Sequence, residues 1–290
     1  MDIKYKITRV QDAQQKDKSV GFLRPYEKED HISVEEPLEM SLKFKRGDKW
    51  NVENISITMR TPGNDEDLIS GFLFNERIIE NINEIEKVET KGEIVGDYNL
   101  QNKIEATINN TKNLDIGKIK RNFITNSSCG VCGKTSLDSI EVLKTEKTDL
   151  SFPKIDYNII LKSPEFLRSN QSEFSKTGGI HASALMDKNG GVIAVREDVG
   201  RHNALDKLIG HVLKNKIIKP ENQFIACSGR LNFELVQKAL MSNIGLMAGV
   251  GAPTSLAIDL AKRFDMTLVG FVKSDSFNIY CNKNRILFKN

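Results

Sequence analysis

The chain has 290 residues, of which 39% are hydrophobic and 28% are charged. This length and composition predict a soluble protein with two packed domains and argue against a membrane protein or a disordered chain. The formal net charge of +3 is small and the lysines alternate with acids, so we expect no nucleic-acid partner.

The first 20 residues are charged, and no apolar run elsewhere approaches the roughly 18 residues that a membrane helix needs. We expect residues 1–20 to be a mobile segment and the protein to be cytoplasmic, without membrane contact. The chain has four cysteines, too few for a disulfide scaffold. In a reducing compartment, a close pair of cysteines is more often reactive or metal-bound than structural.

Residues 21–120 predict a small α+β domain. The β-prone runs 37–46 and 52–60 flank a polar turn, Gly47-Asp48-Lys49, and predict a hairpin. A helix of about three turns should follow, with Asn64 as its cap and acids in its first turn, where the helix dipole favours negative charge.

Two more strand-like runs lie near 84–91 and 103–108 and complete a β-β-α-β-β unit. No catalytic pattern stands out in this unit, so we expect it to serve packing or docking. Its exposed acids and Arg60 could contact a partner.

A cysteine pair follows, at the end of a stretch with few apolar residues. Its sequence is Ser127-Ser128-Cys129-Gly130-Val131-Cys132-Gly133-Lys134. We expect residues 121–145 to form a flexible loop and a short helix that carry the pair, because long loops in compact domains are usually functional or disordered.

Residues 146–290 predict an α/β domain. After a linker near 145–158, the order Ser163-Pro164 is typical of the start of a helix. A hairpin should span 180–195, with its turn at Asp187-Lys188-Asn189-Gly190-Gly191. A helix should come next, because apolar residues recur at spacings of three and four after Asn203.

The last part of the chain alternates strands and helices, a pattern that predicts parallel strands joined by right-handed crossovers. The predicted strands are 223–228, 244–249 and 267–272, and the predicted helices are 231–242 and 253–263.

Three loops then leave the carboxyl ends of these strands at one edge of the sheet. They are Ser228-Gly229-Arg230, Val250-Gly251-Ala252-Pro253-Thr254-Ser255 and Lys273-Ser274-Asp275-Ser276. Two of them open helices, whose free N–H groups favour an anion, so the edge suits a phosphate-bearing ligand such as a nucleotide. Taken singly, glycine-rich loops of this kind also serve merely as tight turns.

The cysteine pair fits three chemistries. A zinc site needs four ligands, but the chain offers only the isolated Cys227 and Cys281 and four histidines besides the pair, so we expect no bound metal. A thioredoxin-like pair would lie at the start of a helix after the first strand of an α/β unit, whereas Cys129 and Cys132 lie in a predicted loop. Sulfur transfer needs an exposed, nucleophilic thiolate on a segment that can move between donor and acceptor. The flanking glycines would favour that movement, and Lys134 would favour the thiolate.

Several long motifs resemble the formate dehydrogenase accessory sulfurtransferases, the FdhD family. Besides the cysteine loop, they are Thr-Gly-Gly-Ile-His-Ala from Thr177, Arg-Glu-Asp-Val-Gly-Arg-His-Asn from Arg196, Cys-Ser-Gly-Arg from Cys227 and Gly-Phe-Val-Lys-Ser-Asp-Ser-Phe-Asn-Ile-Tyr from Gly270. The likeness extends from about residue 22 to the C-terminus.

This resemblance implies a sulfur carrier that passes persulfide sulfur from a cysteine desulfurase to the molybdenum bis(molybdopterin guanine dinucleotide) cofactor, for formate dehydrogenase. It implies a cytoplasmic homodimer with a cytidine-deaminase-like three-layer α/β/α domain behind the small α+β domain. Cys129 would carry the persulfide and Cys132 would assist. The residues implied to contact the cofactor, or a GDP-like nucleotide in its place, are Phe271, Val272, Lys273, Ser274, Asp275 and Ser276.

The topology adds Ser228, Gly229 and Arg230 to the candidate ligand-binding residues, and we include His181 and His202 with them. His181-Ala182-Ser183 is similar to the His-Ala-Glu of deaminases, but the glutamate is missing, so we expect neither deamination nor a catalytic zinc. The roles of His202, Arg196 and Asp198 stay open between ligand binding and ordinary caps and ion pairs. The alternative function is a non-catalytic chaperone that binds and delivers the cofactor.

Overall fold

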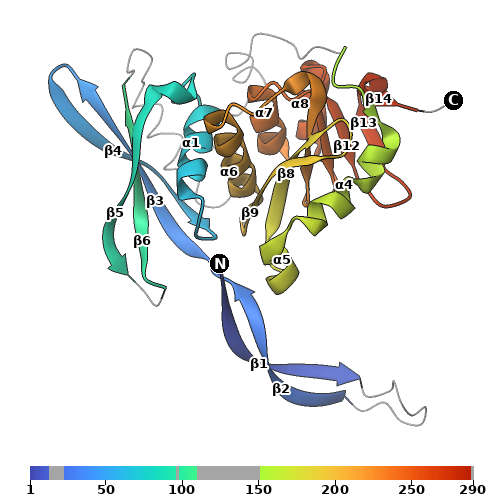
Figure 1. Ribbon diagram of the computed structural model, residues 1–290, viewed down its shortest axis with the longest axis horizontal. Helices are drawn as coiled ribbons and strands as arrows, with labels where there is room; N and C mark the ends of the chain where they lie inside the picture. Colours follow the sequence, from blue (N-terminus) through green and yellow to red (C-terminus); the bar gives the residue numbers. More distant parts are fainter. Residues whose placement is uncertain (13–22, 96–97, 110–150, 289–290) are drawn as a thin grey trace.

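A computed structural model of the chain describes residues 1–12, 23–95, 98–109 and 151–288 (Figure 1). Within these ranges the protein is a mixed α/β structure with two larger sheets and two two-stranded sheets. Its α-helices are α1 (Asp65–Asn75), α4 (Tyr157–Ser169), α5 (Ser172–Thr177), α6 (Arg201–Lys214), α7 (Phe233–Met241) and α8 (Ser255–Arg263). In this part of the chain, none of the helices is both long and apolar enough to span a bilayer.

The six-stranded sheet has the strand order β13-β12-β11-β10-β8-β9. Its strands are β8 (His181–Asp187), β9 (Val192–Asp198), β10 (Gln223–Cys227), β11 (Leu246–Gly249), β12 (Thr267–Gly270) and β13 (Asn278–Cys281). β10, β11 and β12 are parallel, as the alternating pattern predicted, and β8–β9 is the predicted hairpin. β13, which pairs antiparallel with β12, was not predicted because its four residues carry little pattern.

Helices cover both faces of this sheet and make three layers (Figure 1). Side chains alternate along β10, so that Ile225 faces one cluster while Phe224 and Ala226 face the other. The first cluster packs the sheet against α6, α7 and α8, and the second packs it against α4 through Ile160 and Leu167. The six-stranded sheet is therefore a buried platform whose strand ends are held in place from both sides.

The four-stranded sheet has the order β4-β3-β6-β5 and packs against α1. Its strands are β3 (Glu36–Arg46), β4 (Lys49–Arg60), β5 (Ile85–Val95) and β6 (Leu100–Ile108). The predicted hairpin and the β-β-α-β-β unit are confirmed. α1 begins where predicted, but Asn64 does not cap it with its side chain: its left-handed φ of 56° differs from the extended backbone that a capping residue needs.

α1 and α6 cross in close contact and join the two sheets (Figure 1). A Cβ atom built on Gly71 of α1 would lie 1.9 Å from the Asp206 carbonyl oxygen, and one built on Gly210 of α6 would lie 2.0 Å from the Asp67 carbonyl oxygen. Only glycine at both positions permits this approach of the two helix backbones.

Three expectations from the sequence need correction. Residues 1–20 are not wholly a mobile segment, since β1 (Asp2–Asp12) pairs along its length with β2 (Leu23–Ser33) in a hairpin that extends away from the rest of the structure in Figure 1. Arg60 is not available to a partner, because it is fully buried and pairs with Asp65 at 3.0 Å.

Ser163-Pro164 does not start a helix but lies inside α4, which begins after the capping residue Asp156. Proline lacks the N–H that would bond to the carbonyl of Ile160, four residues earlier. Ser163 Oγ donates to that carbonyl instead, at 2.7 Å, so the helix tolerates the proline.

The remaining elements are short. β7 (Ile155–Asp156) pairs with β14 (Ile286–Leu287), and three single turns of 3₁₀ helix lie at Ile82–Glu84, Pro220–Asn222 and Lys283–Arg285.

Candidate functional site

Three loops meet at the carboxyl ends of β10, β11 and β12, as the topology predicted. Backbone hydrogen bonds join them in sequence: Val250 N–H donates to Cys227 O at 3.0 Å, and Gly251 N–H donates to Gly229 O at 3.2 Å. Phe271 N–H then donates to Gly251 O at 3.2 Å. The three loops therefore form one fixed edge and need little ordering when a ligand binds.

Gly251 lies at the centre of this edge. A Cβ atom there would meet the backbone nitrogen of Arg230 at 2.8 Å, closer than side chains allow. The absence of a side chain at this position lets the first two loops touch.

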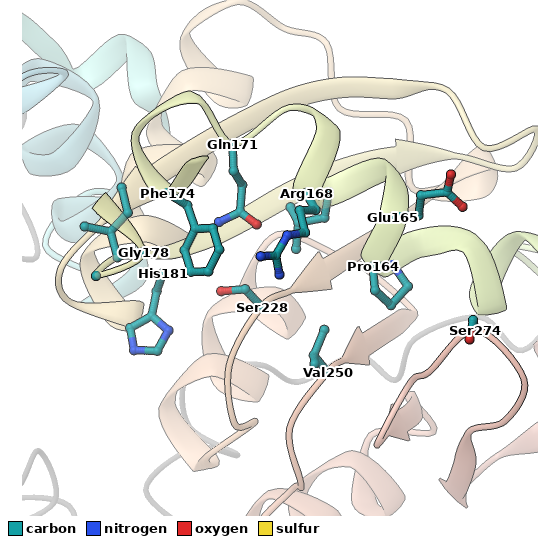
Figure 2. A pocket seen from close by; sticks show the side chains of 13 residues that line it. Pro164, Glu165, Arg168, Gln171, Phe174, Gly178, His181, Ser228, Val250 and Ser274 are labelled. Carbon is teal, nitrogen blue, oxygen red and sulfur yellow. The ribbon is translucent and has the colours of Figure 1, made fainter. Parts of the chain in front are cut away.

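A pocket of about 870 Å³ opens beside the joined loops. On one side it is lined by α4 and α5, and on the other by the start of β8 and the loops at the sheet edge. Figure 2 shows His181 and Ser274 towards opposite ends, with Arg168 and Ser228 between them. A volume of this size accommodates a nucleotide-sized ligand.

The helical wall of the pocket carries three residues that the sequence analysis did not single out. The Arg168 guanidinium lies over the Phe174 ring, 4.8 Å from its centroid. Gln171 is 4% exposed, and its Nε2 has no hydrogen-bond partner among the described residues. Arg168 lies in α4, Phe174 lies in α5 and Gln171 lies at the junction between them, so no single helical period relates the three and the sequence carried no signal for them.

Three of the predicted residues line the pocket: His181, Ser228 and Ser274. Ser228 Oγ accepts a hydrogen bond from Ala182 N–H at 2.9 Å, which leaves its own hydroxyl proton free to donate. Burial and the nearby Arg201 lower the pKa of His181, so its ring is a neutral hydrogen-bonding group at pH 7.

Val250 of the second predicted loop also lines the pocket, whereas the remaining candidate ligand-binding residues of the first and third loops do not. Gly229 packs on the His181 ring, and Arg230 and Lys273 are exposed. Phe271 is 44% exposed, whereas Val272 is buried in the core between the sheet and α4. The turn after β12 closes through Lys273 N–H donating to Ser276 O at 2.8 Å, with Ser276 Oγ bonded to Asp275 at 2.9 Å.

Cys129 and Cys132 lie outside the described residues. The other two cysteines are described, and both are buried. Burial raises the pKa of Cys227 to about 12 and also raises the pKa of Cys281. Because the thiolate is the reactive form, neither thiol is suited to act as a nucleophile.

His202 is not among the residues that line the pocket. Its Nε2 lies 2.8 Å from Asn232 Nδ2 and 3.0 Å from Glu234 Oε2. Burial, followed by the positive charges of Lys238 and Arg201, lowers the pKa of His202 to about 4. Burial also raises the pKa of Glu234. At pH 7 His202 is therefore neutral and supplies no charge to an anion.

Acidification should destabilise the protein through His202. The ring binds a proton more readily in the unfolded chain, where its pKa is about 6.5, than in the folded protein. The contribution of His202 to the free energy of unfolding should therefore be complete above pH 6.5 and should be lost progressively as the pH drops towards 4. The side chain is 32% exposed, so we expect only about 1 kcal/mol between pH 7 and pH 5.

Urea denaturation of the wild type and of His202→Gln at the two pH values measures this effect. The variant keeps a hydrogen-bonding group opposite Asn232 but cannot titrate, so it should lose about 1 kcal/mol less on acidification. Equal losses in the two proteins would show that His202 does not carry this pH dependence.

Arg196 and Asp198 take part in the contact between the two sheets. Arg196 pairs with Asp67 of α1 at 2.8 Å. Asp198 pairs with Lys207 at 2.7 Å and accepts a hydrogen bond from the backbone of Thr61 at 3.1 Å. The structure thus favours ion pairs over ligand binding for both residues.

Comparisons with known proteins agree on one family. The model of the FdhD/NarQ family matches residues 35–287. The chain is 42% identical over 258 residues to the sulfur carrier protein FdhD of Picrophilus torridus, covering 89% of this chain and 92% of that protein. It is 40% identical, with the same coverage, to the sulfur carrier protein FdhD of Sulfolobus acidocaldarius.

The fold is shared with a crystal structure from Desulfotalea psychrophila, described as a formate dehydrogenase accessory protein. The TM-score is 0.69 at 21% identity, and the match covers 99% of each chain. The family model spans most of the sequence, and relatives near 40% identity cover nine-tenths of it. This chain therefore belongs to the FdhD/NarQ family.

Proposed function

We propose that this protein is a sulfur carrier required for formate dehydrogenase activity. In this proposal Cys129 receives sulfur from a cysteine desulfurase and passes it to the molybdenum bis(molybdopterin guanine dinucleotide) cofactor. The observation that carries the proposal is family membership, since relatives about 40% identical over most of the chain are named sulfur carrier proteins.

The proposed transfer is a thiol–persulfide exchange. The Cys129 thiolate attacks the outer sulfur of the donor's persulfide, the donor's sulfur–sulfur bond breaks, and the donor cysteine leaves as a thiolate. Cys129 then bears the persulfide, and Cys132 assists or relays. The burial and raised pKa values of Cys227 and Cys281 support the assignment to the pair, because these two thiols are poor nucleophiles.

The cofactor is the substrate here, and its guanine nucleotide ends each carry a pyrophosphate. The pocket beside the three joined loops is the proposed place for such an end. Its size, the hydroxyls of Ser228 and Ser274 and the guanidinium of Arg168 support this placement, and the exposed Arg230 and Lys273 stand close by. GDP carries both the guanine and the pyrophosphate of such an end and is therefore a suitable probe of this site.

The finer description of the protein belongs to the same proposal. The three-layer packing and the order β9-β8-β10-β11-β12 support a cytidine-deaminase-like fold for residues 146–290. We further propose a homodimer in the cytoplasm, where a carrier thiol stays reduced.

The test is the intact mass of the protein after incubation with a cysteine desulfurase and cysteine. The wild type should gain about one sulfur atom, and Cys129→Ala should gain none, because the thiolate is the acceptor. Cys129→Ala should also fail to support formate dehydrogenase maturation. Cys227→Ala is the matched control and should gain sulfur like the wild type.

If Cys129→Ala accepts sulfur and matures the enzyme like the wild type, the proposal is wrong. If Cys129→Ala gains no sulfur but still supports full maturation, the alternative of a non-catalytic cofactor chaperone is correct instead.

A further inference from the structure

The outer face of the four-stranded sheet carries a row of exposed apolar side chains. The other face packs against α1 and is buried. The row lies on β4 and consists of Trp50, Val52, Ile57 and Met59, which are 48%, 52%, 68% and 48% exposed. A regular strand would place Val52 and Ile57 on opposite faces, but the register shifts at residue 55 and returns them to the same face.

β4 is also an edge strand. The order β4-β3-β6-β5 leaves one side of β4 without a neighbouring strand in the described part of the chain. At its end, Asn203 of α6 bonds to the Thr58 hydroxyl and to the Met59 carbonyl, so the open length is residues 49–57. An exposed, apolar edge strand is a template on which a further strand can pair.

The charges of this face are paired away from Trp50 and unpaired beside it. Three glutamates of the face each have a lysine partner: Glu39 with Lys103 at 3.4 Å, Glu105 with Lys91 at 2.6 Å and Glu89 with Lys87 at 2.7 Å. Lys43 and Lys45 instead lie over the Trp50 ring, each 5.0 Å from its centroid. Among the described residues, neither of these two pairs with a carboxylate. Two positive charges are therefore held over the edge strand.

This arrangement suits a strand that carries both apolar and acidic residues. A strand added to β4 would lie about 4.8 Å away, close enough for its apolar side chains to cover Val52 and Ile57. Acidic side chains next to Trp50 would reach the ammonium groups of Lys43 and Lys45, because the ring holds them over β4 rather than over β3.

Two other occupants fit the charges less well. A second copy of β4 would bring no acid, since its side chains on this face are the four apolar ones and Asn54. Binding to an anionic membrane usually needs a cluster of about four or more basic residues, and only Lys43 and Lys45 lie beside the apolar row.

We infer that β4 is a docking edge for a partner protein, which adds an extended segment with apolar residues over Val52 and Ile57 and acidic residues beside Lys43 and Lys45. The edge belongs to the small sheet, which α1 and α6 separate from the sheet that bears the pocket (Figure 1). The inference goes beyond the proposed function and does not depend on sulfur transfer.

The experiment uses the fluorescence of Trp50, which is the only tryptophan of the chain and reports on this surface alone. The probe is the peptide Glu-Thr-Glu-Thr-Val-Thr-Val-Thr-Glu-Thr-Glu, with acids at both ends so that it can pair in either direction. Added to the full-length protein, it should shift the emission of Trp50 to shorter wavelength as the ring leaves water. The same peptide with lysine in place of glutamate should bind at least about tenfold more weakly, because like charges repel.

Variants of exposed side chains test each part of the surface. Lys43→Gln and Lys45→Gln together should weaken binding of the glutamate peptide about tenfold, through the loss of two charge-assisted contacts. Ile57→Lys should abolish binding. Lys87→Gln on β5 is the matched control, since this lysine already pairs with Glu89, and it should bind within about twofold of the wild type. Thermal melting of each variant separates a folding defect from a binding defect.

Three outcomes would overturn the inference. The first is a Trp50 emission that ignores the glutamate peptide or responds equally to both peptides. The second is a response to phosphatidylglycerol vesicles without a response to the glutamate peptide, which would assign the surface to a membrane. The third is a dimer that Ile57→Lys converts into a monomer in sedimentation velocity, which would assign the edge to a second copy. None of them changes the expected gain of sulfur at Cys129.

Discussion

Replacing Lys207 with methionine should destabilise the protein by about 3–5 kcal/mol, the usual effect of removing one partner of a buried ion pair. Lys207 Nζ lies 2.7 Å from Asp198 Oδ2, and the two side chains are 1% and 0% exposed. The ammonium group also donates to the carbonyl of Thr61 at 2.7 Å. Methionine would leave the buried Asp198 carboxylate without a positive charge beside it, although Thr61 N–H still donates to it, and would leave the Thr61 carbonyl without the lysine donor.

Lys214→Met is the control on the same helix. Lys214 pairs with Glu66 and Asp67 at 3.2 Å each but is 34% exposed, so its loss should change stability by less than about 1 kcal/mol. Urea denaturation, followed by circular dichroism, measures both variants. A Lys207→Met variant that is as stable as Lys214→Met would show that the buried pair contributes little.

Replacing Gly71 with alanine should destabilise the protein by about 3 kcal/mol or more. Overpacking of a core usually costs about 1–3 kcal/mol, and here the added methyl group meets the Asp206 carbonyl oxygen at 1.9 Å. Backbone cannot rotate away as a side chain does, so α1 and α6 must separate. The gain in helix propensity, about 1 kcal/mol, would not offset this.

Gly179→Ala is the control for the same chemical change. A Cβ atom there would come no closer than 3.7 Å to any atom, so stability should stay within about 0.5 kcal/mol of the wild type. Thermal melting of Gly71→Ala, Gly210→Ala and Gly179→Ala compares them directly. If Gly71→Ala and Gly210→Ala have the same melting temperature as Gly179→Ala, then α1 and α6 can separate without loss of packing and the prediction is wrong.

The central architecture was predictable because its signals are local. Alternating apolar strands and amphipathic helices fix the parallel strands β10 to β12, and strand topology then brings their following loops to one edge. Ser228 and Ser274 could thus be placed near a common pocket before the structure was known. His181 joins them because β8 pairs with β10.

The helical wall of the pocket was not predictable in this way. α5 has only six residues, and its position depends on Glu197 of β9, which accepts hydrogen bonds from the backbone N–H groups of Glu173 and Phe174 at 3.0 and 2.9 Å. A contact between side chains and backbone that are far apart in sequence leaves no periodic pattern. The recognition of the α4–α5 wall therefore needed the structure.

The strand β1 was missed for a different reason. It alternates charged and apolar residues, but it lies where a charged N-terminus predicts no structure, and it pairs with β2, the next strand in the chain. Asp2 contacts both His31 of β2 and Lys176 of α5. The contact with α5 is distant in sequence, and strand formation depends on such tertiary contacts as well as on local propensity.

The crossing of α1 and α6 also bears on what counts as a unit of this protein. Asp206 of α6 bonds to Asn75 of α1 at 2.6 Å, and Thr58 and Met59 of β4 bond to Asn203. Expressed alone, residues 146–290 would expose the surface of α6 around Gly210 and would leave Asp206 and Asn203 without these hydrogen-bond partners. The small and large sheets are thus distinct in topology, but each depends on the other for stability. A shortened chain would expose one side of the α1–α6 contact to solvent.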